Sequence, residues 1–252
     1  IDPTAGEILV EGEDVVKMSP IALRDFRRHR TAMVFQKFGL LPHRTVIDNV
    51  GYGLEVQGRG TAERNRISAR WIERVGLAGF ERKYPAQLSG GMQQRVGLAR
   101  ALANDAPILL MDEAYSALDP LIRYDMQTVL LDLQKEVRKT IVFITHDLDE
   151  ALRIGDRIAL LRDGAVIQQG TGQEIVLHPA DDYVANFVQH VDRGKVVRVA
   201  SVMEAAGPET AGPAVAAETT LTDALREMMG HGVQCLVVCD GAGSCLLYTS
   251  PS

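Results

Sequence analysis

Two acidic residues stand at the end of an apolar run. Asp112 and Glu113 follow residues 108–111, whose four apolar side chains predict a buried strand. In open α/β folds, ligands bind at the carboxyl edge of the parallel sheet. One acid could therefore hold Mg²⁺ and the next could polarise an attacking water. An acidic turn after a strand is also a common structural feature, so this pair alone does not establish a function.

A serine and two glycines precede a predicted helix over residues 90–103. Ser89, Gly90 and Gly91 lie at its N-terminus, where free N–H groups and the helix dipole attract an anion. Glycine also lets a phosphate approach the backbone. The alternative is that Ser89 only caps the helix behind a flexible turn, and a lone Ser-Gly-Gly favours that alternative.

Four motifs follow one another along the chain. They are residues 88–93 around the Ser-Gly-Gly, the acid pair 112–113, Ser-Ala-Leu-Asp at 116–119, and Thr-His-Asp at 145–147. The chance of finding all four in this order is well below about 1%. Over roughly residues 1–192 the series resembles the nucleotide-binding subunit of ATP-binding cassette (ABC) transporters.

The predicted elements indicate an α/β fold. Apolar strands at 31–35, 108–111 and 140–145 alternate with helices at 61–75, 90–103 and from Pro120 onward. This pattern is typical of a parallel sheet covered on both faces. The resemblance implies a P-loop NTPase-like ABC ATPase domain. Such a domain has a parallel sheet core, a helical subdomain and a small antiparallel part. We expect the helical subdomain between Gln36 and about residue 80, and a hairpin that turns at Asp163 and Gly164.

The resemblance implies four residues that act on the nucleotide and its metal. Asp112 is similar to the Walker B acid on Mg²⁺, and Glu113 to the general base. His146 is similar to the switch histidine that hydrogen-bonds the γ-phosphate. Gln36 is similar to the Q-loop glutamine, which touches Mg²⁺ or water and couples to the membrane subunit. Taken singly, each of these side chains is more often structural, and only the set favours the functional interpretation.

A second set is implied to face ATP held by a twin subunit. Residues 88–93 resemble the signature motif, and residues 116–119 resemble the D-loop that crosses the dimer interface. The expected nucleotide contacts are Ser89, Gly90, Gly91, Gln93 and Asp119. For Asp119, which precedes Pro120, the alternative is an ordinary helix cap. The resemblance thus implies ATP and Mg²⁺ as cofactors and a homodimer that closes over two ATP molecules.

Three longer stretches indicate a particular subfamily of ABC transporter ATPases. Residues 35–46, 112–123 and 145–151 together resemble the ATPase of glycine betaine/L-proline importers, which take up quaternary-amine osmoprotectants across the bacterial inner membrane. This implies transmembrane permease subunits and an extracytoplasmic substrate-binding protein as partners. It also implies a peripheral location on the cytoplasmic face of the membrane. The alternatives are an ABC importer for amino acids and a non-transport ABC ATPase.

Charge argues against a nucleic-acid partner. The 27 Lys and Arg residues are outnumbered by 33 Asp and Glu residues, which gives a net charge of −6. Nucleic-acid binders usually carry a basic surplus or stripe. The basic runs at 24–30 and 59–74 contain interspersed acids, so we expect a solvated or subunit-contacting face there.

Composition suggests four segments. Residues 1–192 form the expected nucleotide-binding domain, and residues 193–218 form a linker marked by Gly-Pro pairs at 207 and 212. Residues 219–243 resemble the first part of a cystathionine-β-synthase-type (CBS) regulatory module, and the alternative is a short helix–strand appendage. Residues 244–252 match neither pattern and form an unassigned tail.

The phosphate-loop motif Gly-x-x-x-x-Gly-Lys-Ser/Thr does not occur among the 252 residues. Family members carry this Walker A motif just before the segment that resembles residues 4–8. We therefore expect that these 252 residues alone bind ATP poorly or not at all and are inactive as an ATPase, because the lysine and the phosphate cradle are missing. Titration with nucleotide and Mg²⁺ tests this expectation, and micromolar affinity would contradict it.

Overall fold

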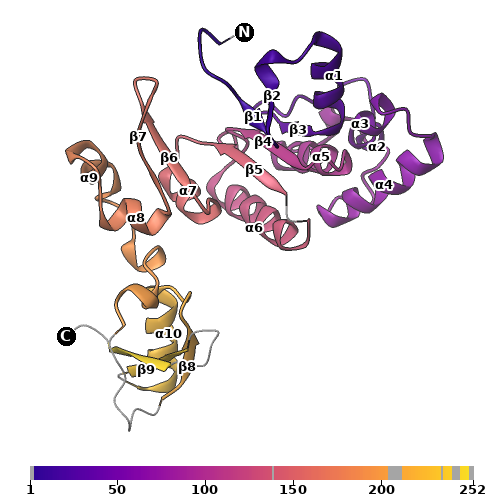
Figure 1. The fold of residues 1–252 in the computed structure, drawn as a ribbon. Coiled ribbons are helices and arrows are strands. Elements are labelled where there is room, and N and C mark those ends of the chain that lie inside the picture. The colour runs from indigo at the N-terminus through magenta and orange to yellow at the C-terminus, as the bar shows by residue number, and fades with distance from the viewer. Residues whose placement is uncertain (1–2, 138, 204–211, 234, 240–244, 250–252) are drawn as a thin grey trace. The chain divides into compact units, whose positions relative to one another are not determined.

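A three-stranded parallel sheet organises the first half of the chain (Figure 1). The computed structural model describes residues 3–137, 139–203, 212–233, 235–239 and 245–249. These residues belong to two compact units, residues 1–146 and residues 147–252, and each unit is described by itself below.

The sheet of the first unit has the order β3-β4-β5. Its strands are β3 (Thr31–Val34), β4 (Ile108–Asp112) and β5 (Thr140–Ile144). Both strand pairs are parallel, with Val34 opposite Met111 and Asp112 opposite Ile144. Since parallel strands end at the same edge, the residues that follow all three strands lie close together.

Helix α5 (Gly90–Ala103) is the central helix of this unit, and its bounds match the predicted range. Ser89 caps it, because its hydroxyl accepts a hydrogen bond from Met92 N–H. Three helices pack against α5 in the region expected to be helical (Figure 1). They are α2 (Val46–Val50), α3 (Tyr52–Val56) and α4 (Thr61–Arg74). The helical part predicted between Gln36 and residue 80 is therefore present.

The remaining elements of the first unit are short except for α6 (Pro120–Val137). Helix α6 buries Met126, Leu130 and Leu133, and its Glu136 forms an ion pair with Arg74 of α4. The other elements are β1 (Leu9–Val10), β2 (Glu13–Asp14), η1 (Val15–Lys17), α1 (Pro20–His29) and η2 (Pro85–Gln87).

The prediction that both faces of the sheet are covered is wrong for one face, whose side chains are exposed. Met33, Val142 and Ile144 project from this face, and Ile144 is 57% exposed. The opposite face is buried through residues such as Leu109 and Met111. Neighbouring residues of a strand point to opposite faces, so this alternation separates the two sides. Both sides are apolar in sequence, and apolar character alone therefore could not distinguish a covered face from an uncovered one.

The predicted hairpin is confirmed in the second unit. Strands β6 (Ile158–Arg162) and β7 (Ala165–Gly170) pair antiparallel. Asp163 and Gly164 both have positive φ, at 50° and 78°, as a tight two-residue hairpin turn requires. After the hairpin, Thr171 and Glu174 form a capping box at the start of the next helix. Helices α7 (Leu148–Ile154), α8 (Gly172–Leu177) and α9 (Asp182–Val188) complete this part.

The rest of the second unit has its own small core, made of Val199, Ala224, Met228, Leu236 and Val238. Its elements are η3 (Arg193–Lys195), η4 (Val199–Ser201), β8 (Ala214–Ala216), α10 (Leu221–His231), β9 (Cys235–Cys239) and β10 (Cys245–Thr249). The stretch 193–218, whose composition indicates a linker, contributes Val199 to this core. The tail contributes β10, which pairs antiparallel with β9. Residues 204–211, 240–244 and 250–252 lie outside the described residues, and the CBS-like assignment stays a prediction.

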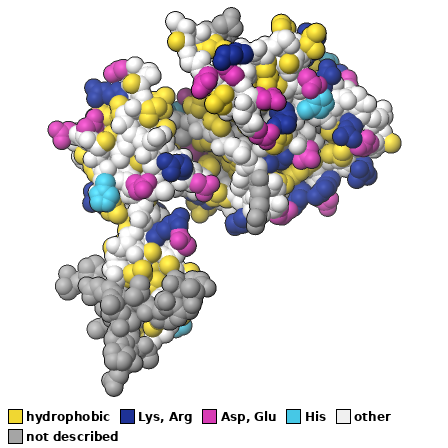
Figure 2. All heavy atoms as spheres, viewed as in Figure 1, with side chains coloured by type: hydrophobic (Ala, Val, Ile, Leu, Met, Phe, Trp, Pro, Cys, Tyr) yellow, Lys and Arg dark blue, Asp and Glu magenta, His cyan; other side chains and the backbone are white. Residues whose placement is uncertain are grey.

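Basic and acidic side chains are interspersed on the face shown in Figure 2. Around α4, for example, Arg59 pairs with Glu63, and Arg64 pairs with Glu55. Hydrogen bonding, first of all to Arg44, lowers the pKa of the Glu55 carboxyl below its ordinary value.

Of the helices described, none is both long enough and apolar enough to cross a bilayer.

Burial along α6 gives a test of the fold. Leu130 is 2% exposed and Leu121, on the same helix, is 71% exposed. We expect Leu130→Ala to lower the free energy of unfolding by about 2–5 kcal/mol through lost burial and a cavity, and Leu121→Ala by less than about 0.5 kcal/mol. Urea denaturation followed by the fluorescence of Trp71, the single tryptophan of the chain, measures both changes. Equal effects of the two substitutions would contradict the described packing of α6.

Candidate functional site

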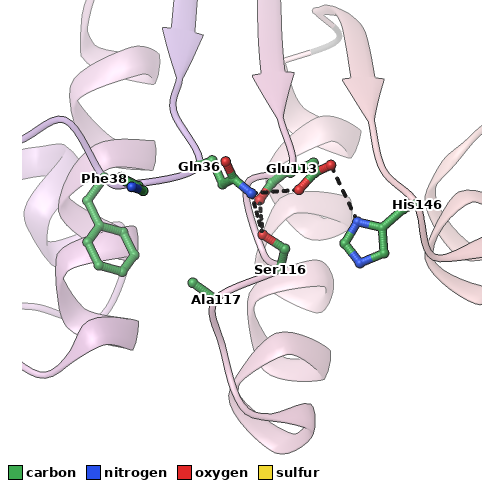
Figure 3. A pocket seen from close by; sticks show the side chains of 7 residues that line it. Gln36, Phe38, Glu113, Ser116, Ala117 and His146 are labelled. Atoms are coloured by element: carbon green, nitrogen blue, oxygen red, sulfur yellow. Dashed lines mark hydrogen bonds and ion pairs between the residues drawn. The ribbon is translucent and has the colours of Figure 1, made fainter.

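The carboxyl edge of the parallel sheet opens into a pocket of about 470 Å³ (Figure 3). Three of the predicted residues line it, each just beyond the end of one strand: Gln36 after β3, Glu113 after β4 and His146 after β5. The full lining consists of Gln36, Lys37, Phe38, Glu113, Ser116, Ala117 and His146. The sequence thus predicted the three strand-end residues that meet there.

Glu113 lies between two hydrogen-bonding groups. Gln36 Nε2 donates to Glu113 Oε2 at 2.6 Å, and His146 Nδ1 lies 3.4 Å from Glu113 Oε1 (Figure 3). The Glu113 side chain is about one-third exposed, whereas that of His146 is 69% exposed. Both side chains line the same pocket and are partly exposed, so small molecules can reach the carboxylate.

The backbone at Glu113 adopts an uncommon conformation. Its φ of 41° lies in the left-handed region, which a non-glycine residue occupies only when its surroundings hold it there. Glu113 N–H donates to Ile144 O at 2.9 Å, which ties the turn to β5. Ser116 fixes the other side, because its N–H and its hydroxyl both donate to Glu113 O, at 3.1 and 3.0 Å. Non-glycine residues in such conformations cluster at functional sites.

Ser116 also faces Gln36. Its Oγ lies 3.4 Å from Gln36 Nε2, so the Gln36 amide reaches both the serine and the Glu113 carboxylate. Ser116 thereby links the turn after β4 to the loop after β3.

Asp112 is the last residue of β4 and its side chain is exposed. It does not line the pocket, although it is adjacent to Glu113 in sequence. The carboxylate of Asp112 and the amide oxygen of Gln36 are both ligand types that suit Mg²⁺. Among the described residues, no group of three or more His, Cys, Asp or Glu side chains could hold a metal by itself. Any Mg²⁺ bound here would take its other ligands from water or from a phosphate.

The residues at the tip of α5 do not themselves line the pocket. Ser89 is exposed, and its Oγ accepts from Met92 N–H at 3.3 Å. Gln93 Nε2 donates to Leu88 O at 3.2 Å. Ser89 thus serves as the helix cap that the sequence offered as an alternative.

Two further predicted contacts have local structural roles. A Cβ atom at Gly91 would lie 2.6 Å from Ile122 Cγ2, so close packing on α6 requires glycine there. Asp119 Oδ1 accepts from Ile122 N–H at 3.1 Å and caps the start of α6. Gly90 is exposed. The structure therefore brings Gln36, Glu113 and His146 together, and leaves Ser89, Gly90, Gly91, Gln93 and Asp119 outside this pocket.

Sequence reasoning gave no role to Lys37 and Phe38, which follow Gln36 and line the pocket. Their position directly after a strand that ends at the site was the available signal. Ala117 falls inside the predicted D-loop, although no contact was assigned to it.

Comparison with known proteins connects this geometry to a family. A model of the ABC transporter family matches residues 1–116. The glycine betaine transport ATP-binding protein OpuAA of Bacillus subtilis (strain 168) is 58% identical over 206 residues, which are 82% of this chain and 49% of OpuAA. The trimethylamine N-oxide transport system ATP-binding protein TmoW of Ruegeria pomeroyi is 47% identical over 237 residues, 94% of this chain and 69% of TmoW. The chain thus spans about half the length of OpuAA.

Solved structures give the same result. The dimeric structure of MJ0796, a bacterial ABC transporter cassette, matches with a TM-score of 0.62 and 36% sequence identity. The match covers 68% of this chain and 75% of that one. A post-hydrolysis state of the same cassette, bound to ADP and Pi, matches equally well. The predicted ABC ATPase fold is confirmed, and the chain belongs to the ABC transporter family.

Proposed function

We propose that this chain is part of the ATP-hydrolysing subunit of an importer for glycine betaine- and proline-type osmoprotectants. The observation that carries the proposal is the position of Glu113, whose carboxylate lies between Gln36 and His146 at the carboxyl edge of the sheet. Water can reach this carboxylate because the pocket is open and Glu113 is partly exposed.

Glu113 is suited to act as the general base. An ionised carboxylate offers about four acceptor positions, so the contacts with Gln36 and His146 leave room for a water molecule. Glu113 would accept the proton of the water that attacks the γ-phosphate of ATP. His146 faces Glu113 through Nδ1. With protons on both ring nitrogens, His146 would donate from Nδ1 to Glu113 and from Nε2 to the γ-phosphate. Such groups act mainly by positioning and by electrostatic stabilisation of the transferred phosphoryl group.

Asp112 and Gln36 are the proposed Mg²⁺ ligands. When bound, Mg²⁺ would neutralise charge that develops on the phosphates. It usually binds through one or two carboxylates together with substrate phosphates, which suits the single exposed carboxylate of Asp112. Beyond holding the ion, Gln36 keeps Glu113 oriented through its amide N–H.

The proposed site is completed by a second copy of the chain. Ser89, Gly90, Gly91, Gln93 and Asp119 lie outside the pocket of Gln36 and Glu113, which fits residues that act on ATP held by a twin subunit. The match to a dimeric cassette supports this arrangement. We further propose transmembrane permease subunits and an extracytoplasmic binding protein as partners, with this subunit at the cytoplasmic face of the membrane.

The names of the relatives support the substrate class. OpuAA is named for glycine betaine and TmoW for trimethylamine N-oxide. Both compounds carry a nitrogen with three methyl groups, so we propose methylated amines as the transported solutes. An amino-acid importer is the alternative.

Glu113→Gln in the full-length protein tests the general base. We expect ATP turnover to fall by about 10²–10⁴-fold, because the amide cannot accept the proton. ATP binding should persist and trap a closed dimer. Steady-state phosphate release and gel filtration with ATP measure the two effects.

The matched control is Glu227→Gln, the same chemical change at an exposed position on α10. It should leave turnover unchanged. Unchanged turnover in Glu113→Gln would remove Glu113 from its proposed role.

Uptake assays test the transported solute. Cells that depend on this transporter should accumulate labelled glycine betaine under high osmolarity, and Glu113→Gln should abolish that accumulation. Excess unlabelled trimethylamine N-oxide should compete for uptake, since it presents the same trimethylated nitrogen, whereas excess methionine should not. Competition by methionine alone would favour the amino-acid importer.

A further inference from the structure

The loop after Gln36 makes an unusual turn against α5. Phe38 and Gly39 both have positive φ, at 57° and 54°. Phe38 N–H donates to Phe35 O at 3.2 Å, and Gly39 N–H donates to Lys37 O at 2.5 Å. Phe38 is a bulky residue in a region that favours glycine, so this turn needs outside support to persist.

That support comes from Arg100, which lies about three turns into α5. Its Nη1 donates to Gly39 O at 2.7 Å and its Nη2 donates to Phe38 O at 3.1 Å. One guanidinium therefore holds the carbonyls of both left-handed residues. The planar fork of arginine suits two such bonds better than the single ammonium of lysine.

Arg100 is largely buried at this contact, and burial lowers the pKa of its guanidinium below the ordinary value. A buried cation is costly unless its donors are satisfied. The carbonyls of Phe38 and Gly39 provide such acceptors, so the helix and the loop stabilise each other. Loss of the guanidinium would leave both carbonyls without this partner.

Phe38 also lies along α5 toward the tip of the helix. A Cβ atom at Gly97 would lie 3.7 Å from Phe38 O, and one at Gly90 would lie 3.7 Å from Phe38 Cζ. Phe38 therefore contacts α5 from its first residue to its third turn. On its other side Phe38 lines the pocket of Gln36 and Glu113.

We propose that Arg100 is a positioning residue that fixes the Phe38–Gly39 turn. By holding this turn, Arg100 keeps the Gln36 amide hydrogen-bonded to the Glu113 carboxylate. The Arg100 side chain would then link the position of α5 to the position of the Glu113 carboxylate, which is proposed to activate water. This inference rests on the proposed function, because it assigns Arg100 a part in ATP turnover. Arg100 itself does not line the pocket.

Hydrogen exchange of the full-length protein tests the link without any need for ATP turnover. In Arg100→Gln, exchange of the Phe38 and Gly39 amides should rise about tenfold or more, because hydrogen bonds from a charged group are lost. Arg100→Lys keeps the charge but not the fork, and should give an intermediate increase. If Arg100→Gln does not fold, as judged by Trp71 fluorescence, Arg100→Lys alone decides the outcome.

The matched control is Arg95→Gln. Arg95 lies on the same helix and also donates to a main-chain carbonyl, Val75 O at 2.9 Å, but this carbonyl belongs to the turn after α4. Arg95→Gln should leave exchange at Phe38 and Gly39 unchanged. Equal increases in the two variants would indicate general loosening and would overturn the inference, as would unchanged exchange in Arg100→Gln.

Kinetics provide the second measurement. In Arg100→Gln the kcat for ATP should fall about tenfold while KM changes less than about twofold, because only the placement of Gln36 and Glu113 is affected. Faster exchange with unaltered kcat would overturn the positioning role. If the unmodified full-length protein hydrolyses no ATP, the proposed function fails, and the exchange result separately decides whether Arg100 holds the turn.

Discussion

The parallel register of β3, β4 and β5 is the constraint on which the site depends. Gln36 and Glu113 are 77 positions apart in sequence, yet their side chains meet because both follow strands that end at one edge. His146 reaches the same carboxylate from the end of β5. A slip of one residue in either strand pair would turn these side chains to the other face of the sheet. Buried strand residues such as Leu109 and Met111 hold the register, so they also determine where the side chains at the strand ends lie.

Each of the two segments that meet at this contact contains a residue with a strained backbone. Glu113 and Phe38 are non-glycine residues in the left-handed region, a conformation that costs of order 1–2 kcal/mol each. Each is held by groups from other elements, Glu113 by β5 and Ser116, and Phe38 by Arg100. Since these supports come from separate parts of the first unit, the Gln36–Glu113 hydrogen bond depends on the correct packing of that unit.

The sequence predicted those parts of the fold that depend on local pattern. Helix α5, the hairpin at Asp163 and Gly164, and the strand-end positions of Gln36, Glu113 and His146 all follow from periodicity, turn residues and motif order. The uncovered face of the sheet did not follow, because Val142 and Ile144 have the same apolar character as their buried neighbours.

Arg100 escaped prediction for a related reason. An arginine within a helix carries no motif, and its role arises only from two carbonyls that belong to a distant loop. The packing of residues 193–203 was hidden in a similar way, since Val199 lies close to a stretch rich in alanine, glycine and proline whose composition is typical of a linker. Long-range partners, rather than local composition, decide such positions.

The capping role of Ser89 at the tip of α5 is compatible with the nucleotide contact proposed for it. A hydroxyl can accept and donate at once, so Ser89 Oγ can accept from Met92 N–H and still offer its own proton to a phosphate. Gln93 N–H donates to Ser89 O, and the two other N–H groups of this first turn belong to Gly90 and Gly91. At Gly91, the close approach of Ile122 leaves no room for a side chain. The helix cap therefore leaves the Ser89 hydroxyl proton available for the proposed contact with a phosphate.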